Sequence, residues 1–206
     1  MRQRGWIFIV TAMFLSLLAT SASGAGGTGG ISLSAGFTPM AGGDAGSGTF
    51  APEYDEAYDT GWTGRIEPYY DFTSMIRGQA GVGYNKWGGN TYLGSQFDDL
   101  KVMTYYVGVK FRFLPNSNIR PYAVADIGFA NIDSVKVSGI GQYWDSTTTA
   151  FLDIGGGVEF FVAQKVSFFL DMRVQATGEP DSAHPTANNS DGIGSVPITM
   201  GVNFTF

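Results

Sequence analysis

The single histidine of the chain lies close to two other side chains that nucleophilic catalysis uses. Asp181 and Ser182 precede His184 by three and two residues. A Ser-His-Asp site needs a rigid scaffold, and its members usually come from separate segments. Here the three residues share one stretch rich in small polar residues, which is typical of a loop. We therefore expect a solvated loop histidine and no catalytic residue.

A second group of candidate residues is acidic and interleaved with aromatic residues. Its members are Glu53, Asp55, Glu56 and Asp59. Hard divalent cations favour clustered carboxylates, but the spacing lacks the ordered ligand pattern of a calcium loop. Without cysteine, and with one histidine, the chain also lacks the ligands of the common zinc sites. We expect no metal site and no cofactor, and leave open whether this acidic loop is simply solvated or contacts a partner.

A third group consists of charged residues that alternate with apolar ones. Their parity places them on one face of regular strands, opposite the apolar face. Acidic and basic members are equal in number, as a low-dielectric interior requires, because an unpaired buried charge is costly. The predicted charge network consists of Arg65, Glu67, Arg77, Lys110, Arg112, Asp126, Asp153, Glu159, Asp171 and Arg173.

Strands must position these residues, because the dominant periodicity of the sequence is two. The alternation is clearest in four segments and weaker in four others, which gives eight strands of about ten residues, a length that crosses a bilayer when tilted. No stretch predicts a convincing amphipathic helix. The predicted strands lie near 31–38, 62–72, 76–86, 103–113, 119–129, 150–161, 166–175 and 198–206.

The connections between these strands alternate in length. Short turns are expected near 73–74, 114–118 and 163–165, and long connections near 39–61, 87–100, 130–148 and 176–195. The long ones are rich in Gly, Ser, Thr, Asn and Asp, so we expect them not to bury enough apolar surface to pack. Short turns on one side and long loops on the other predict an all-β fold, an eight-stranded antiparallel up-and-down transmembrane β-barrel.

Alternation alone does not say which face meets water, and a soluble barrel would put its apolar face inward. Aromatic residues near the ends of the apolar faces favour a lipid-facing surface, because aromatic girdles mark both membrane interfaces. The last predicted strand is itself aromatic at its end. The aromatic residues near the ends of the apolar faces are Phe37, Tyr105, Phe111, Phe113, Phe160, Phe204 and Phe206.

Composition excludes several other classes of protein. The chain has 206 residues, 30 of them glycine, and 15% charged residues. With 12 basic and 18 acidic residues it lacks the basic surface of a nucleic-acid-binding protein. Without cysteine it has no disulfide framework.

The first 25 residues are typical of a secretory signal peptide. Arg2 and Arg4 precede an apolar run, and small residues follow it. The run is shorter than the ~20 residues of a spanning helix. We expect residues 1–25 to be removed and residues 26–206 to form the barrel domain.

Several segments give the sequence a family resemblance. They are Gly64–Phe72, Arg120–Tyr122, Gly155–Phe160 and the closing Gly201–Phe206. Together with the signal and the eight strands, they resemble the small outer-membrane β-barrels of Gram-negative bacteria related to OmpX and to the transmembrane domain of OmpA. The resemblance covers essentially the whole mature chain. It implies location in the bacterial outer membrane after signal cleavage, with the termini in the periplasm and the long loops outside.

The resemblance also implies partners and roles. Phe204 and Phe206 resemble the signal that the barrel assembly machinery recognises. Outer-membrane lipids and lipopolysaccharide are expected partners, and a monomer is the expected state. The implied role is envelope integrity or surface interaction through the loops, with a host or surface ligand that the sequence does not identify. The cell-wall-binding domain of full-length OmpA-type proteins is not found after Phe206, so we expect no tether to peptidoglycan.

Three functional hypotheses remain open at this point. The lumen is expected to be plugged by ion pairs, since eight strands enclose little more than their own side chains; a narrow porin-like channel is the alternative. A lipid A-modifying barrel enzyme is the third, but its His-x-Ser motif would read His184-Pro185-Thr186 here. A further hypothesis is that the acidic outer loops meet lipopolysaccharide phosphates through bridging Mg²⁺ or Ca²⁺.

Overall fold

Eight long strands form one closed barrel in the computed structural model, which describes residues 27–46, 52–188 and 190–206. The expected signal peptide lies outside the described residues. The barrel strands are β1 (Thr28–Thr38), β2 (Gly61–Asp71), β3 (Ile76–Trp87), β6 (Leu100–Arg112), β7 (Ile119–Ile132), β10 (Thr147–Ala163), β11 (Val166–Thr177) and β13 (Ile198–Thr205).

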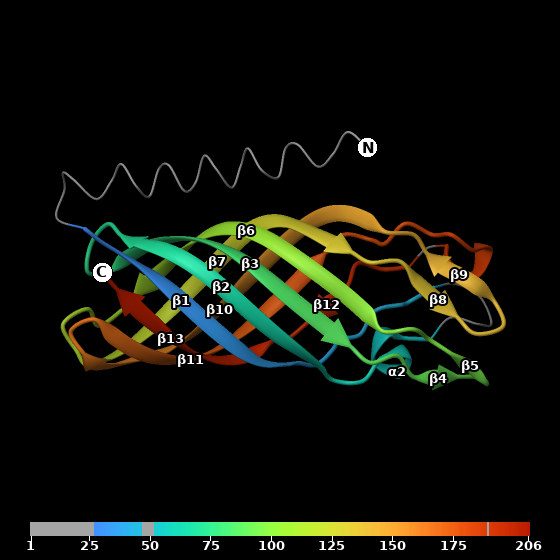
Figure 1. Ribbon diagram of the computed structural model, residues 1–206, viewed down its shortest axis with the longest axis horizontal. Coiled ribbons are helices and arrows are strands. Elements are labelled where there is room, and N and C mark those ends of the chain that lie inside the picture. Colours follow the sequence, from blue (N-terminus) through green and yellow to red (C-terminus); the bar gives the residue numbers. More distant parts are fainter. Residues whose placement is uncertain (1–26, 47–51, 189) are drawn as a thin grey trace.

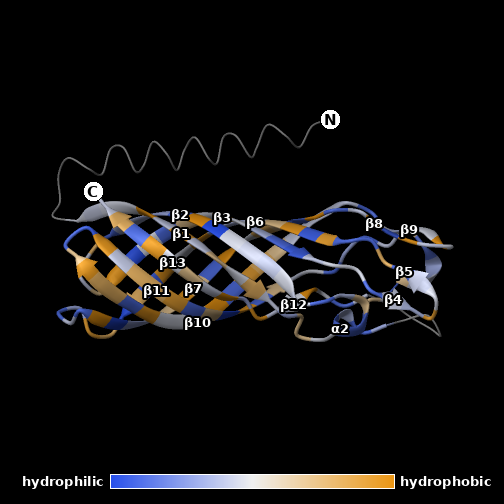
Figure 2. Cartoon of the chain, turned by 60° about the horizontal axis from the view of Figure 1, so that its bottom comes forward, coloured by the Kyte–Doolittle hydropathy of each residue, from blue (hydrophilic) through white to orange (hydrophobic). Residues whose placement is uncertain are grey.

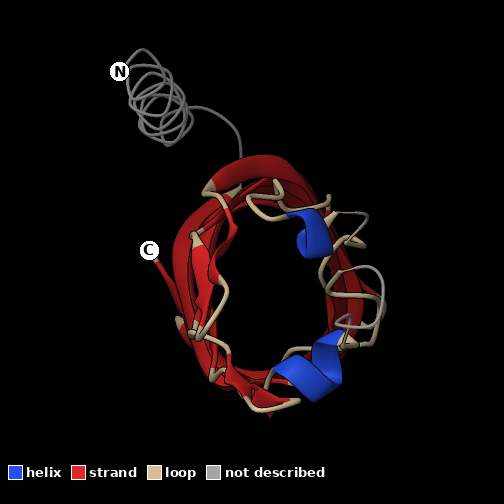
Figure 3. Ribbon diagram, turned by 90° about the vertical axis from the view of Figure 1, so that its right-hand side faces the viewer, coloured by secondary structure: helices blue, strands red, loops and turns tan. Residues whose placement is uncertain are grey.

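Each barrel strand pairs antiparallel with its neighbours in chain order, and β1 pairs with β13 to close the ring. The view along the axis shows this closed wall of strands (Figure 3). The short strand β12 (Gly194–Ser195) adds only two pairs to β11. The predicted eight-stranded up-and-down barrel is therefore confirmed. Among the described residues, no helix is long and apolar enough to cross a bilayer.

Strand lengths range from 8 residues in β13 to 17 in β10. The strands that most exceed the predicted length of about ten residues are β7 and β10, which continue past their expected ends. They do so because they keep pairing with each other as far as Ile132 and Thr147. The barrel wall is therefore taller on this side than the alternation alone indicates.

The two ends of the barrel differ sharply. The three short turns and the described chain termini lie at one end, here called the turn end (Figure 1). The four long connections lie at the other, here called the cap end. The short turns span residues 72–75, 113–118 and 164–165, so all three lie within or next to the segments predicted to turn.

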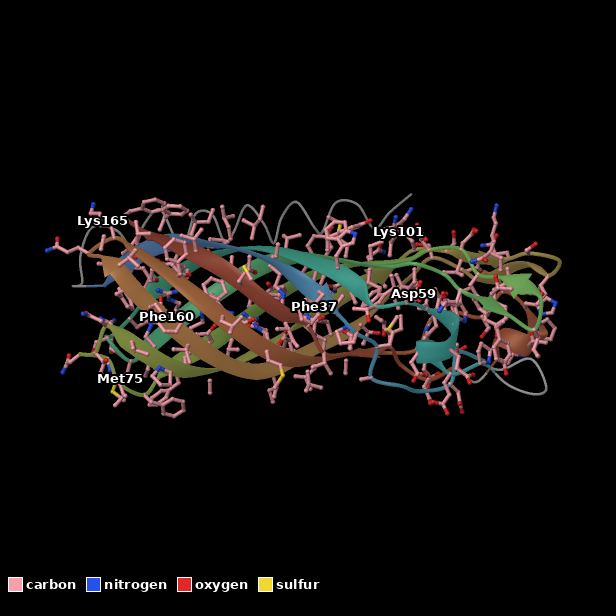
Figure 4. The ribbon with its side chains drawn as sticks, turned by 90° about the horizontal axis from the view of Figure 1, so that it is seen from below. Phe37, Asp59, Met75, Lys101, Phe160 and Lys165 are labelled. Carbon is pink, nitrogen blue, oxygen red and sulfur yellow. The ribbon has the colours of Figure 1, made fainter. Side chains whose placement is uncertain are left out.

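The outer face of the barrel is apolar. Alternate residues along the strands are exposed hydrophobic side chains, including Leu33, Ile127, Val174 and Met200. Figure 2 shows the resulting pattern of hydrophobic positions on the barrel wall, which fades toward the cap end. Phe37 and Phe160 project from this wall, Phe160 near the turn end of the barrel and Phe37 near the cap end (Figure 4). The outer face therefore suits lipid.

Aromatic residues gather near both edges of this outer face. Those expected from the sequence are exposed, except that Tyr105 is half-buried. Trp62, Phe72, Phe129 and Phe168 are exposed as well. Such a distribution is typical of the two interfaces of a bilayer.

The hydrophobic core of the molecule lies mainly at the cap end. The four long connections fold into a compact structure, here called the cap, made of the described parts of residues 39–60, 88–99, 133–146 and 178–197. It holds one helical turn, α2 (Tyr54–Ala57), the 3-10 turn η1 (Pro185–Ala187) and two hairpins, β4 (Thr91–Tyr92) with β5 (Ser95–Gln96) and β8 (Val135–Val137) with β9 (Gly141–Trp144).

The expectation that these loops do not pack was wrong. Tyr54, Tyr58, Phe97, Tyr143 and Trp144 come from three different connections and are all at most 2% exposed. Their rings lie in mutual contact, with centroid distances of 5.7 Å for Tyr54–Trp144 and 5.5 Å for Phe97–Tyr143. The loops pack because a few large aromatic residues converge from segments far apart in sequence, a property that the average composition of each loop hides.

Polar atoms within this aromatic core also find partners. Trp144 Nε1 donates to Ser190 Oγ at 3.1 Å, and the Tyr54 hydroxyl donates to the Asp191 carbonyl at 2.9 Å. Burial raises the pKa of Tyr54 and of Tyr58 well above their usual value, so both phenols stay protonated. Among the described residues of the cap, the buried aromatic core therefore contains no ionised side chain.

We expect Trp144→Ala to open the cap while leaving the barrel intact. Removing a buried tryptophan costs about 3–5 kcal/mol, and the Trp144 ring contacts Tyr54 and Tyr58 of another connection as well as its neighbour Tyr143. Limited proteolysis of the detergent-folded protein should show faster cleavage in the cap. Leu93→Ala is the matched control, because Leu93 is 68% exposed at the β4–β5 turn; equal protease resistance of both variants would contradict a packed cap.

Candidate functional site

The predicted charge network lies inside the barrel. All ten of its side chains are at most 3% exposed. The strand register explains this, because alternate residues of each strand face the axis and neighbouring strands keep the same phase. The charges divide into layers along the axis.

The first layer lies near the turn end. Arg112 donates to Glu159 at 2.9 Å through Nε and to Asp71 at 3.0 Å through Nη1. Arg77 donates to Asp71 through Nε and Nη2, at 2.7 and 3.1 Å. Glu159 also accepts from Ser167 and Asn203, at 2.7 Å each. Two carboxylates and two guanidinium groups thus form a neutral, fully hydrogen-bonded layer.

The second layer is centred on Arg173. Its nitrogens lie 2.7 Å from Asp126, 2.9 Å from Asp171, 3.4 Å from Glu67 and 3.6 Å from Asp153. Uncharged groups complete the layer: Gln79 donates to Asp126 at 2.9 Å and Thr199 to Asp171 at 2.6 Å. One guanidinium group therefore holds together four carboxylates from four different strands.

Arg65 and Asp153 form the layer nearest the cap. Arg65 Nη1 lies 3.4 Å from Asp153 Oδ2, which also accepts from Gln175 at 3.0 Å. Asp153 and Asp126 are direct cross-strand partners of β10 and β7. Like charges placed opposite each other destabilise a sheet, so these carboxylates depend on Arg65 and Arg173.

Lys110 differs from the other nine predicted residues. It forms no ion pair within the described part of the chain. Its ammonium group lies 4.2 Å from the centre of the Tyr122 ring and 5.2 Å from that of Phe169. Aromatic faces attract cations, so Lys110 is held between rings, close to the first and second ionic layers.

The charge network predicted from the alternation of the strands omitted two charged residues that face the barrel axis. Asp71 joins Arg77 and Arg112 in the first layer, and Arg120 lies at the mouth of the turn end. Both share the phase of charged residues that were counted, Glu67 and Asp126. Extending the alternation to the ends of their strands would have found them. With both included, six acidic and six basic residues face the lumen.

Glycines give the large lumen side chains their space. A side chain on Gly81 would collide with the ring of Tyr106, and one on Gly108 with the carboxylate of Asp126. These two positions show why bulky residues fit in a barrel that is only just wide enough for side chains. The ionic layers below and the aromatic cap above therefore fill the interior.

The predicted acidic loop lies on the cap. Glu53, Asp55, Glu56 and Asp59 are exposed. Glu53 and Glu56 form the capping box of α2, in which the Glu53 amide donates to Glu56 Oε2 at 3.3 Å. Within the described ranges, no group of three or more histidine or carboxylate side chains is arranged to hold a metal ion.

The three residues considered for nucleophilic chemistry bind separate partners. Ser182 Oγ donates to the Ala187 carbonyl at 2.6 Å, and Asp181 accepts from Thr147 Oγ1 at 2.6 Å. His184 Nδ1 caps η1 and lies 2.9 Å from Thr186 Oγ1. Ser182 and His184 thus stabilise the loop around η1, Asp181 ties this loop to the start of β10, and the three side chains form no catalytic triad.

The two terminal aromatic residues lie at the turn end. Phe204 on β13 is exposed toward the outside of the barrel, and Phe206 is the most exposed large hydrophobic residue of the described chain. The Phe206 amide donates to the Gly29 carbonyl at 2.9 Å, which continues the closing β1–β13 pairing.

We expect Arg173→Met to destabilise the barrel strongly. Breaking a buried ion pair by removing one partner costs about 3–5 kcal/mol, and Arg173 holds four carboxylates. Urea unfolding in detergent micelles measures the loss. Adding Asp126→Asn to this variant should recover part of the stability, whereas Lys165→Met, at an exposed turn, should change little. A near-neutral Arg173→Met would mean that the ionic layers do not stabilise the fold.

Comparison with known structures gives similar barrels. Neisserial surface protein A shares 19% identity over 85% of this chain and 97% of its own, with a TM-score of 0.55. A major outer membrane protein from Thermus thermophilus shares 11% over 88% and 100%, also at 0.55. Ail, the attachment invasion locus protein of Yersinia pestis, in complex with the heparin analogue sucrose octasulfate, shares 15% over 87% and 99%, at 0.51.

These identities show a common fold and no more. No curated protein matches the sequence. The family model described as outer membrane protein beta-barrel domain matches residues 8–206, which is nearly the whole chain. The apolar outer wall, the charged lumen and this match agree with one another. The chain belongs to the outer membrane protein beta-barrel family, and its place is the bacterial outer membrane.

Proposed function

We propose that this protein is a closed structural barrel of the outer membrane that presents a rigid acidic cap at the cell surface. The observation that carries the proposal is the distribution of charge. Every acidic residue outside the lumen lies on the cap and is exposed: Asp44, Glu53, Asp55, Glu56, Asp59, Asp98, Asp99, Asp133, Asp145, Glu179, Asp181 and Asp191.

Few cations offset these twelve carboxylates. The cap end has three lysines, Lys86, Lys101 and Lys136, and Lys86 is already paired with Asp99 at 2.7 Å. This hydrogen bond lowers the pKa of Asp99 below its usual value. The cap thus has a strongly negative field that attracts cations and basic surfaces. Ail was crystallised with a heparin analogue, but an acidic cap repels such polyanions, so we do not extend that ligand to this chain.

The closed interior favours a structural role over a porin-like channel. A permeating ion would have to pass three layers of paired charges and then the aromatic core of the cap. The side chains that form these barriers are buried and hydrogen-bonded to several strands, so opening a path requires breaking many contacts together.

We expect no steady single-channel conductance from the purified protein in planar bilayers. The physical reason is that the lumen is filled by the ionic layers. Recordings on the wild type, Arg112→Ala and Glu159→Gln provide the measurement. Steady unitary steps in the wild type that either substitution abolishes would overturn the plugged barrel and favour a channel.

We propose lipopolysaccharide as the immediate partner of the acidic cap. Asp59, Asp99 and Asp133 lie within two residues of the cap ends of β2, β6 and β7, near the level where lipid head groups meet the barrel. Figure 4 shows Asp59 and Lys101 at this junction of barrel and cap. Mg²⁺ or Ca²⁺ would bridge these carboxylates to lipid phosphates, since hard cations prefer oxygen ligands.

We expect chelation to lower the heat stability of the protein in lipopolysaccharide-containing vesicles and to make the cap more sensitive to protease. Folded and unfolded bands on a gel, with Mg²⁺ or with EDTA, give the measurement. The double variant Asp59→Asn/Asp133→Asn should reduce the Mg²⁺ effect, whereas Lys136→Gln should not. Identical melting with and without chelator would rule out the cation bridge.

Two further assignments belong to this proposal. Phe204 and Phe206 would serve as the assembly signal, which their exposed position on the terminal strand and beyond it supports. No enzymatic role is included, because Asp181, Ser182 and His184 each bond a separate partner, which favours a structural role for that loop. A monomer accords with a barrel whose ring closes within one chain.

A further inference from the structure

A polar cavity opens at the turn end of the barrel, opposite the acidic cap. Its volume is about 570 Å³, within the range of small-molecule sites. We call it the cup. The lining residues that carry the argument are Asp71, Thr73, Arg112, Arg120, Phe161 and Thr205.

Arg120 is the distinctive residue of the cup. Its Nε donates to the Ser117 carbonyl at 2.8 Å, and its guanidinium carbon lies 3.8 Å from the centre of the Phe161 ring. Among the described residues, no carboxylate forms an ion pair with it and no acceptor bonds its terminal nitrogens. The guanidinium group is therefore fixed in orientation while two of its nitrogens remain able to bind a ligand.

The charge balance of the cup leaves Arg120 uncompensated. The floor consists of Asp71 and Arg112, which belong to the layer in which two acids balance two arginines. Arg77 and Arg112 already supply Asp71 with short bonds to both oxygens. One positive charge thus remains at the wall of the cup, beside a floor with no net charge.

The rest of the lining offers neutral donors. Thr73 Oγ1 accepts from the amides of Met75 and Ile76, at 3.1 and 3.0 Å, so its proton is left to point elsewhere. Thr205 shares a 2.8 Å hydrogen bond with Tyr69. Hydroxyl and amide groups around a preorganised arginine suit a planar or tetrahedral oxyanion, because guanidinium binds such groups through two parallel bonds.

We propose that the cup binds one oxyanion, a carboxylate or phosphate group, through Arg120. The cavity is larger than a single ion needs, so the group belongs to a larger molecule that enters from the turn end. A carboxylate would come from an acidic peptide, and a phosphate from a phosphorylated small molecule or lipid head group. This site is independent of the cap and lies at the other end of the barrel.

Titration of the detergent-folded, isotope-labelled protein tests the proposal. Sodium phosphate and sodium acetate are added separately at constant ionic strength, with sodium chloride as reference, while backbone amide shifts are followed by NMR. We expect saturable shifts confined to residues around the cup, such as Ser74, Asn118 and Gln164. Saturation by phosphate alone indicates a phosphate source, and saturation by acetate indicates a carboxylate source.

Substitutions locate the binding group. Arg120→Gln should weaken binding at least tenfold, and Arg120→Lys, which keeps the charge but loses the paired nitrogens, should weaken it less. Lys165→Gln is the matched control, because Lys165 lies exposed at the same end but does not line the cup (Figure 4). Heat-modifiable gel migration verifies that each variant is folded; if Arg120→Gln fails to fold, Arg120→Lys supplies the comparison.

Two results would overturn the proposal. One is the absence of saturable shifts beyond those that chloride produces. The other is unchanged affinity in folded Arg120→Gln or Arg120→Lys protein.

Discussion

Closure of the sheet is the constraint on which the rest of this structure depends. In a lipid bilayer every backbone N–H and C=O group must find a partner within the protein, because no water is present to replace it. Pairing of β1 with β13 removes the last free edges and fixes the ring at eight strands. A ring of this size leaves an interior only wide enough for side chains. The inward-facing side chains must therefore both fill the lumen and balance one another's charges.

The barrel and the cap are filled by different kinds of interaction. Inside the barrel wall, arginines and carboxylates from different strands form ion pairs, as Arg173 does with Glu67, Asp126 and Asp153. Above the wall, aromatic residues such as Tyr58 and Trp144 exclude water instead. The ordinary roles are thereby reversed: charge fills the spanning part, and a hydrophobic core forms in the part that leaves the membrane.

Much of the barrel could be predicted because its pattern is local. A period of two along each strand separates lipid-facing from inward-facing residues, which placed all ten predicted charges on the inner face. Asp71 and Arg120 were not predicted to face the lumen, because they lie where strands run into short turns and the alternation is hard to follow. The packing of the cap was not predicted for another reason. Composition averages over a whole loop, whereas packing depends on which few residues of several loops meet.

The sequence by itself determined the class of fold, the side of each strand that faces lipid and the acidity of the long connections. These properties follow from residue type and spacing within single segments. Only the tertiary structure decided that Arg77 and Arg112 share Asp71, that four connections form one aromatic core, and that Arg120 faces a cavity without an ionic partner. Each depends on ring closure, which brings together residues that are distant along the chain, and no local pattern encodes such distances.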